Sequence, residues 1–309
     1  MRFSIVIPVY KNEVNIPRLL VAVAAMNGTL NGELEAVFVV DGSPDRSFEL
    51  LRDALDVLPC PSQLLAHSRN FGAFPAIRTG LMAARGEYFG VMAADLQEPP
   101  ELAVSFFTAL AADECDVVIG TRDARQDPWT SRLASGAFWG FYRRFVVKDM
   151  PPGGVDIFGC NRTFRDHLLR MEESHSSLIA LIFWLGFRRK LVGYERRSRL
   201  EGTSAWTLRK KIDYMLDSVF AFTDYPIQLL IRLGAVGCLL SAVMALIVIG
   251  ARFMGLIHIP GYAATMIAVL FFGAMNLLGL GLVGNYAWRA YENSKRRPLA
   301  VVASHLTNR

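Results

Sequence analysis

The sequence predicts an α/β domain followed by a pair of membrane-spanning helices. Apolar, β-branched runs alternate with helical runs between residues 3 and 120, an order typical of a parallel sheet with helices on both faces. Two stretches without Asp, Glu, Lys or Arg follow, at 233–251 and 253–288. A spanning helix needs about 20 mostly apolar residues, so we expect spans near 233–251 and 263–287 with a tight turn between them.

Each element of the α/β domain is predicted from its local pattern. The expected strands are mostly apolar runs, at Phe3–Val9, Glu35–Val40, Gln63–Ala66, Tyr88–Ala93 and Val117–Gly120. The expected helices between them are Ile16–Met26, Phe48–Leu58, Pro75–Ala84 and Pro100–Ala112. The last of these helices begins at prolines, which suit a first helical turn.

The pattern loosens after Gly120. Trp129–Phe145 is expected to form an amphipathic helix and Met150–Gly154 a loop. Basic and apolar residues interleave over Ser204–Thr223, which favours a helix lying along a membrane interface before the first span. We also expect Pro298–Val302 to add an edge strand to the sheet.

Charged residues flank the two expected spans and predict an orientation. Lys and Arg cluster at 188–211 and 289–297, whereas the turn between the spans has neither. By the positive-inside rule both ends lie in the cytosol. No signal peptide is visible, because the first apolar run predicts a strand. Two buried core helices are the alternative, but soluble helices rarely stay uncharged on every face for so long.

The net charge of +5 and the scattered cysteines limit the possible partners. Basic residues beside the spans suit anionic headgroups or an anionic lipid substrate. They match no nucleic-acid-binding module, so no nucleic-acid partner is expected. The cysteines at 60, 115, 160 and 238 form no CxxC motif, which indicates a reducing compartment without a zinc or disulfide framework.

Acidic residues lie just past two of the expected strands. Asp41 and Asp95 occupy these positions, where sheets of this kind bind ligands. Where the chain stays extended, Asp95 and Gln97 share a face and offer the oxygen ligands that hard divalent cations prefer. A polar strand end is the alternative. Asp41 could accept hydrogen bonds from a base or ribose, or form an Asx turn that caps the next helix.

Further polar residues could complete such a site. Glu13, shortly after Tyr10, is a candidate nucleotide contact or a simple helix-start charge. Arg69 and Asn70 precede a helix start, so they could position phosphates or form a structural loop. Asp156 follows a Gly-Gly pair, which allows close backbone approach. Its carboxylate could act as a base, orient a substrate or belong to a turn.

Basic residues near the spans are candidates for binding an acceptor phosphate. Any one arginine is compatible with a solvated face, but clustering beside membrane spans favours phosphate contact for some of them. The candidates are Arg122, Arg132 and Arg199, together with the hydroxyl of Ser204.

Eight short segments together resemble one family. In chain order they are Pro8–Glu13, Val40–Asp45, Ser68–Gly72, Ala84–Glu87, Asp95–Glu101, Gly120–Arg122, Arg199–Trp206 and Lys295–Pro298. On these segments the chain resembles the polyisoprenyl-phosphate glycosyltransferases of glycosyltransferase family 2. That group includes bactoprenol glucosyltransferases and dolichyl-phosphate mannose synthases. The resemblance covers nearly the whole chain, including the two-span tail.

The resemblance implies a GT-A (Rossmann-like) catalytic fold, a nucleotide-sugar donor, a Mg²⁺ or Mn²⁺ ion and a polyprenyl-phosphate acceptor. It implies metal ligands at Asp95 and Gln97 and an active-site carboxylate at Asp156, so that Asp95 and Asp156 are the catalytic candidates. Arg199 and Ser204 would lie near the donor or acceptor phosphates. The implied donor contacts are Pro8, Tyr10, Glu13 and Asp41, and the implied acceptor-phosphate contacts are Arg122, Arg132 and Ser135.

The chain also departs from the family pattern. Ala93 stands where the family usually has the first acid of Asp-Ala-Asp, so one expected acidic ligand is missing. Glu98 replaces an aspartate and Ala73 a histidine. Phe158 and Ala205 stand at positions where the family often has an arginine and a lysine. These differences bear on sugar identity and on metal affinity.

The chain is therefore expected to divide into four parts. These are a cytosolic GT-A domain (1–203), juxtamembrane helices (204–228), a two-helix membrane hairpin (229–290) and a cytosolic tail (291–309). We expect transfer of a hexose from a UDP-sugar such as UDP-glucose to undecaprenyl phosphate, with inversion, at the bacterial inner membrane. The resemblance suggests a homotetramer.

Three alternatives remain. A membrane-anchored nucleotide-sugar binder without catalysis is the first, and loss of the acid at Ala93 is its basis. A processive polysaccharide synthase would need more spans and usually a Gln-x-x-Arg-Trp motif. A two-span channel is disfavoured because the spans carry few polar residues.

Overall fold

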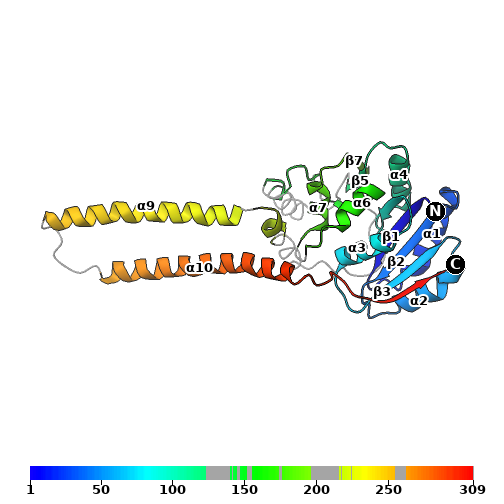
Figure 1. Cartoon of the computed structure of the whole chain (residues 1–309), viewed down its shortest axis with the longest axis horizontal. Coiled ribbons are helices and arrows are strands. Elements are labelled where there is room, and N and C mark those ends of the chain that lie inside the picture. The colour runs from blue at the N-terminus through cyan, green and yellow to red at the C-terminus, as the bar shows by residue number, and fades with distance from the viewer. Residues whose placement is uncertain are drawn as a thin grey trace.

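The computed structural model describes residues 1–122, 140, 142–144, 147–151, 155–173, 176–195, 216, 218–223, 225–254 and 262–308. Figure 1 shows an α/β domain from which two long helices, α9 (Tyr225–Phe253) and α10 (Tyr262–Ser294), extend side by side. Both chain ends lie at the domain rather than at the far end of the helices.

The α/β domain is built on one mixed sheet. Among the described residues it has eight strands in the order β7-β5-β6-β4-β1-β2-β3-β8. The prediction of a parallel sheet is correct for β4-β1-β2-β3, but β6 runs antiparallel to both β4 and β5, and β8 runs antiparallel to β3. The strands are β1 (Phe3–Val9), β2 (Leu34–Val40), β3 (Ser62–His67), β4 (Tyr88–Val91), β5 (Val117–Arg122), β6 (Val155–Asn161), β7 (Arg189–Tyr194) and β8 (Val302–Thr307).

Helices cover both faces of this sheet, as the sequence pattern predicts. Ile5 and Ile7 of β1 pack with α1, α2 and α4, whereas Val6 between them packs with α3, α6 and α7 on the opposite face. Alternate residues of a strand point to opposite faces, so a continuous apolar strand serves two cores at once. The helices are α1 (Ile16–Thr29), α2 (Ser47–Ala54), α3 (Ala73–Ala83), α4 (Pro100–Ala111), α6 (Arg162–Leu169) and α7 (Leu178–Trp184).

A glycine lets α3 approach the sheet closely. A Cβ atom on Gly80 would lie 2.3 Å from Val6 Cγ1 and 3.2 Å from Val39 Cγ2. Helix α3 therefore rests directly on β1 and β2. This contact fixes where the N-terminus of α3 meets the carboxyl ends of those strands.

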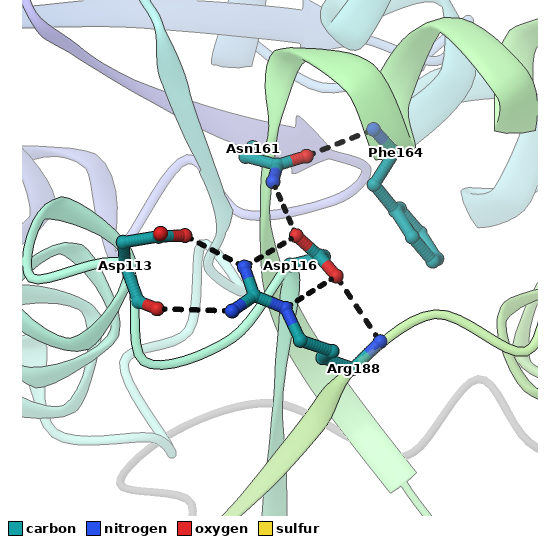
Figure 2. A network of polar contacts seen from close by, with 5 residues as sticks. All are labelled: Asp113, Asp116, Asn161, Phe164 and Arg188. Carbon is teal, nitrogen blue, oxygen red and sulfur yellow. Dashed lines mark hydrogen bonds and ion pairs between the residues drawn. The ribbon is translucent and has the colours of Figure 1, made fainter.

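A polar network joins β5, β6 and β7 (Figure 2). Arg188, before β7, donates from Nε and Nη2 to the two carboxylate oxygens of Asp116, both at 3.1 Å, and from Nη2 to Asp113 Oδ1 at 2.6 Å. Asn161 donates from Nδ2 to Asp116 at 3.0 Å and accepts from the Phe164 N–H at 2.9 Å, which caps α6. The start of β5, the end of β6 and the start of β7 are thus held at one carboxylate.

Asp116 gives the folded domain an acid-dependent stability. Hydrogen bonds from Arg188 lower the pKa of this carboxyl despite its partial burial. A carboxyl with a lowered folded-state pKa stabilises the fold above its unfolded pKa of about 3.9 and loses that contribution as pH falls through the folded value.

We therefore expect Arg188→Ala to lower the thermal midpoint of unfolding at pH 7. The further decrease of that midpoint as the pH falls below about 4 should be smaller in this variant than in the unaltered chain. Arg188→Lys should lose less at pH 7, since it keeps the charge but not the forked geometry. Thermal unfolding followed by circular dichroism between about pH 2.5 and 7 measures both effects. An unchanged acid dependence in Arg188→Ala would show that this ion pair does not set the response.

The two predicted apolar segments lie in long helices. These are α9 (Tyr225–Phe253) and α10 (Tyr262–Ser294), both longer than the spans predicted at 233–251 and 263–287. Within the described part of the chain, no helix combines the length and the apolar character needed to cross a membrane. The predicted spans are thus not confirmed, and the turn between them lies outside the described residues.

The base of α10 packs against the short helical segment before α9. Tyr286 donates its hydroxyl to the Thr223 carbonyl at 3.2 Å and meets the Phe220 ring edge-on. The Arg289 guanidinium lies 5.1 Å from the same Phe220 ring. The two ends of the helical pair are therefore joined where they leave the domain.

Some predicted elements shift or fall outside the described residues. The edge strand predicted at Pro298–Val302 instead spans Val302–Thr307, where it pairs antiparallel with β3. The helices predicted at Trp129–Phe145 and Ser204–Thr223 lie largely outside the described residues.

Candidate active site

Four loops meet at the carboxyl ends of the central parallel strands. They follow β1, β2, β3 and β4, and in α/β sheets this edge is where ligands bind. β6 runs antiparallel to β4 and β5, so its first residues reach the same edge. The backbone of Asp156, the second residue of β6, therefore lies on the side that carries Asp41 and Asp95.

The first two loops are cross-braced by hydrogen bonds. The Lys11 N–H donates to Ser43 Oγ at 2.8 Å, and the Glu13 N–H donates to Asp45 Oδ2 at 3.1 Å. A further hydrogen bond joins the same two loops, because the Glu13 side chain accepts at Oε2 from the Arg46 N–H at 3.0 Å. The loops that carry Tyr10 and Asp41 are held in one arrangement by these reciprocal bonds.

Asp45 is the acceptor at the centre of this brace. Burial would raise the pKa of its carboxyl, but hydrogen bonds from Ser43, Ser47 and two backbone N–H groups outweigh that effect and lower it. The carboxylate therefore stays ionised at neutral pH. Glu13 stays a predicted nucleotide contact, and the structure adds that its carboxylate also braces the start of α2.

Asp41 is buried and accepts three hydrogen bonds. Its Oδ1 accepts from His67 Nδ1 and from the Phe71 N–H, both at 2.8 Å, and its Oδ2 accepts from the Gly72 N–H at 2.7 Å. These donors lie far along the chain, so the alternative of an Asx turn capping the next helix is not what the structure shows. Contact with a nucleotide stays a prediction for this residue.

Two of these hydrogen bonds come from Phe71 and Gly72, directly before α3, so Asp41 lies beside the N-terminus of that helix. Helix N-termini attract anions because their first N–H groups have no partner within the helix. Asp41 places a carboxylate from the chain itself beside this helix start, bound to N–H groups that precede the first helical residue, Ala73. Phosphate positioning at this helix start stays a prediction, and Arg69 is the exposed cation beside it.

Residues 68–72, here called the donor loop, follow β3 and carry Arg69. The Arg69 guanidinium stacks on the Phe71 ring, with 4.0 Å between its central carbon and the ring centroid, and Nη1 donates to the Asn70 carbonyl at 3.1 Å. Arg69 is exposed. Its charge therefore faces solvent from a side chain already held in place.

Gly42 allows the donor loop to approach β2. Its φ of +57° lies in the left-handed region, and a Cβ atom there would lie 2.3 Å from Arg69 C and 2.4 Å from Asn70 N. No flexible side chain can move aside, because both atoms belong to the backbone. Glycine is therefore required at position 42 both by the positive φ and by the close approach of the backbone of Arg69 and Asn70.

Asp95 and Gln97 lie on a tight turn after β4. The expected extended chain is wrong here, since Leu96 between them has a φ of +53°. The Gln97 N–H donates to Asp95 Oδ1 at 3.3 Å, and Gln97 is buried whereas Asp95 is partly exposed. A joint role of Asp95 and Gln97 in metal binding therefore cannot be explained by their lying on one face of an extended strand.

The described residues contain no group of three His, Cys, Asp or Glu side chains placed to hold a metal ion. The two predicted metal ligands at this edge are one carboxylate, Asp95, and one amide, Gln97. Mg²⁺ often takes one or two protein carboxylates and completes its shell with substrate phosphates and water. Asp95 and Gln97 are therefore compatible with a metal ion that binds together with a nucleotide.

The remaining predicted residues divide into two groups. Pro8 and Tyr10 are partly exposed at the end of β1, and Lys11 Nζ lies 5.5 Å from the Tyr10 ring centroid. Arg122 ends β5, although neither its side chain nor that of Asp156 is described. The predicted residues that lie outside the described part of the chain are Arg132, Ser135, Arg199 and Ser204.

Sequence reasoning missed His67. Its side chain is fully buried, with Nδ1 at 2.8 Å from Asp41 and Nε2 at 2.9 Å from Thr79 Oγ1. A carboxylate only accepts, so Nδ1 carries a proton. A histidine at the carboxyl end of a strand, next to the Ser68–Gly72 motif, was the available signal.

Comparison with known proteins now identifies the family. The family described as "Glycosyl transferase family 2" matches residues 4–170, which hold the central strands and the loops at their carboxyl ends. The chain belongs to glycosyl transferase family 2. The resemblance seen in the sequence motifs is thereby confirmed.

Relatives of this family-2 chain match along nearly their whole length. An uncharacterised glycosyltransferase of Synechocystis is 31% identical over 98% of this chain and 95% of its own. An undecaprenyl-phosphate 4-deoxy-4-formamido-L-arabinose transferase of Pectobacterium carotovorum is 33% identical over 96% of this chain and 90% of its own.

Solved structures are more distant. Mannosyl-3-phosphoglycerate synthase from Rubrobacter xylanophilus is 15% identical, with a TM-score of 0.47 over 76% of this chain and 75% of that one.

We expect Gly42→Ala to destabilise the domain by about 1–3 kcal/mol, because it combines backbone overlap with an unfavourable φ. Gly32→Ala is the matched control, since Gly32 also has a positive φ (+78°) but nothing lies within 4 Å of the position that an added Cβ would take. Urea unfolding measures both. Equal losses in the two variants would mean that the close approach of the donor loop contributes nothing.

Proposed function

We propose that this family-2 glycosyltransferase transfers a sugar from a nucleotide-sugar, a UDP-hexose such as UDP-glucose, to polyprenyl phosphate. The observation that carries the proposal is the joining of two features in one chain. A braced set of loops lies at the carboxyl edge of the sheet, and two helices with exposed apolar side chains extend from the same domain (Figure 1). Similarity to an undecaprenyl-phosphate sugar transferase over 96% of the chain supports a lipid acceptor.

The donor would lie across the loops after β1, β2 and β3. In the proposal, Tyr10 and Pro8 contact the base, and Glu13 and Asp41 fix the ribose side of the donor. Arg69 offers a fixed, exposed guanidinium to the diphosphate. Arginine suits this task because its planar donors match phosphate oxygens.

A Mg²⁺ or Mn²⁺ ion would be held by Asp95 and Gln97 together with the donor. When bound, such an ion offsets charge on a departing diphosphate. The protein side supplies a turn whose Asp95 carboxylate is oriented by the Gln97 N–H. The absence of a second acid at Ala93 makes the metal site depend on oxygens from the donor.

The proposed reaction is a direct displacement with inversion. An oxygen of the acceptor phosphate forms a bond to the anomeric carbon, while the bond from that carbon to the donor diphosphate breaks. The electron pair leaves with the nucleoside diphosphate. A phosphate monoester has a second pKa of about 6, so the acceptor is mainly dianionic at neutral pH and needs no base.

In the proposal, basic residues bind the acceptor phosphate. These are Arg122, Arg132 and Arg199, with hydroxyls from Ser135 and Ser204. Asp156 would orient the substrates from the start of β6. A carboxylate beside an anionic nucleophile is suited to orientation rather than to proton abstraction.

We extend the proposal to a membrane location. Large apolar side chains on α9 and α10, including Leu239, Leu246, Phe253 and Leu277, are exposed, and exposed apolar surfaces of this extent are typical of interaction with lipid or protein. At the base of α10, Lys295 Nζ lies 4.2 Å from the Tyr291 ring and 5.0 Å from the Trp288 ring. Aromatic and basic residues are enriched where a membrane meets water. A bacterial inner membrane and a homo-oligomeric state belong to the same proposal.

The deciding experiment incubates the full chain with undecaprenyl phosphate, Mg²⁺ or Mn²⁺, and a panel of UDP- and GDP-sugars. We expect one metal-dependent glycosyl-phosphoryl lipid, detected by mass spectrometry. Nucleotide binding without any lipid product across the panel would contradict the proposal and favour a binder without catalysis.

The role of Asp156 can be tested separately. We expect Asp156→Asn to lower kcat by less than about 10-fold, whereas loss of a general base typically costs about 10²–10⁴-fold. The acid limb of the kcat profile should stay near pH 6, which is about the second pKa of the acceptor phosphate. Asp53→Asn, on exposed α2, is the control. Loss of the acid limb in Asp156→Asn would establish a base role.

A further inference from the structure

The segment after α10 returns to the α/β domain and borders the donor loop. β8 is the outermost strand on this side of the sheet and pairs antiparallel with β3, as Figure 1 shows. β3 ends at His67, directly before the donor loop. A strand that arrives from beyond both long helices therefore supports the strand that leads into the candidate donor site.

The far end of β8 is fixed by Asn308. Its Oδ1 accepts from the Ser62 N–H at 2.5 Å, and its Nδ2 donates to the carbonyls of Leu55 and Cys60 at 2.9 and 3.1 Å. One side chain thus satisfies three backbone groups between Leu55 and the first residue of β3, Ser62. These contacts join residues that are between 246 and 253 positions apart in the chain.

The middle of β8 is joined to a buried polar chain. His305 Nε2 lies 2.7 Å from Gln63 Oε1, and Gln63 Nε2 donates to Glu35 Oε1 at 2.8 Å. Because Gln63 uses its amide oxygen as the acceptor, His305 must donate. β8, β3 and β2 are therefore linked by side chains as well as by their backbones, which fixes the register of β8.

The near end of β8 contacts the donor loop itself. The regular pairing has an irregularity between Ala66 and His67, after which His67 pairs with Val302. The Ser68 N–H then donates to the Val301 carbonyl at 2.9 Å. Pairing with the C-terminal segment thus continues past the last residue of β3 and into the first residue of the donor loop.

The same strand end positions Asp41. The His67 backbone pairs with β8, and its buried ring holds Asp41 on one side and Thr79 on the other. Asp41 in turn holds the Phe71 and Gly72 N–H groups at the other end of the donor loop. The loop is therefore held at its start by Val301 and at its end by Asp41, and both restraints depend on β3 staying in place.

We infer that β8 positions the donor loop, so that affinity for a nucleoside diphosphate depends on a segment that follows α10. The inference rests on the proposed function, because it takes the donor loop to be part of the nucleotide-sugar site. Val301, His305 and Asn308 are positioning residues that touch no substrate. The short segment 295–301 joins the base of α10 to this strand, so the helical pair and the donor site are coupled through it.

Linkage makes the inference testable in the unaltered chain. If β8 favours the nucleotide-binding arrangement, bound nucleotide must stabilise β8 by the same factor. Hydrogen exchange of the full chain is followed by mass spectrometry with and without UDP and Mg²⁺, and with GDP in parallel. We expect exchange of 301–308 to slow by about 5-fold or more, the lower end of typical coupling between linked sites, together with that of 68–72.

A pair of full-length variants gives a second measurement. Asn308→Ala should raise the UDP dissociation constant and the donor KM by about 5-fold or more, with kcat at saturating donor kept within about 2-fold, at a temperature where circular dichroism shows a folded domain. Ala303→Ser, on the exposed side of β8, is the matched control and should change neither quantity.

The outcomes separate this inference from the proposed function. Nucleotide binding that protects 68–72 but leaves 301–308 unchanged would overturn the inference alone. A lower thermal midpoint in Asn308→Ala with an unchanged donor KM would do the same, since it would show a purely structural role. If the unaltered chain binds neither UDP nor GDP, the proposed donor site and the inference both fail.

Discussion

The buried carboxylate of Asp41 is the interaction on which the carboxyl edge of the central strands depends. A buried charge is tolerated only where it is fully hydrogen-bonded, and here the donors come from the His67 ring and from the backbone of Phe71 and Gly72. Meeting that requirement brings together the end of β2, the end of β3 and the start of α3. Gly42 follows from it, because the donor loop can reach Asp41 only if no Cβ stands in the way.

The opposite end of β2 is organised on the same physical basis. Glu35 is buried and accepts from Ser4 Oγ at 2.6 Å, from Gln63 Nε2 at 2.8 Å and from the Arg85 N–H at 2.8 Å. β2 therefore has a carboxylate that accepts three hydrogen bonds near its start and another just past its end. Neighbouring elements are aligned by these two charges as well as by apolar packing, and two fixed ends leave the strand little freedom to slip in register.

The sequence predicted those features that depend on local pattern. Alternating strands and helices up to β5, the meeting of Asp41 and Asp95 at one edge, and the family all followed from periodicity and motifs. The reversal of β6 did not, because the long segment after Arg122 gives no sign of strand direction. The turn between Asp95 and Gln97 was missed because a leucine with positive φ is rare. The roles of His67 and Asn308 depend on partners distant in the chain, which local patterns do not reveal.

The position of β8 has a consequence for how the molecule is made. During synthesis the α/β domain leaves the ribosome well before residues 302–307, and until they arrive β3 is an edge strand with unpaired backbone groups. Exposed edges of this kind favour association with other chains, and closing so long a loop is slow. A nascent chain must therefore keep β3 soluble while both apolar helices are still being synthesised, and chaperone binding to this edge would be most valuable in that interval.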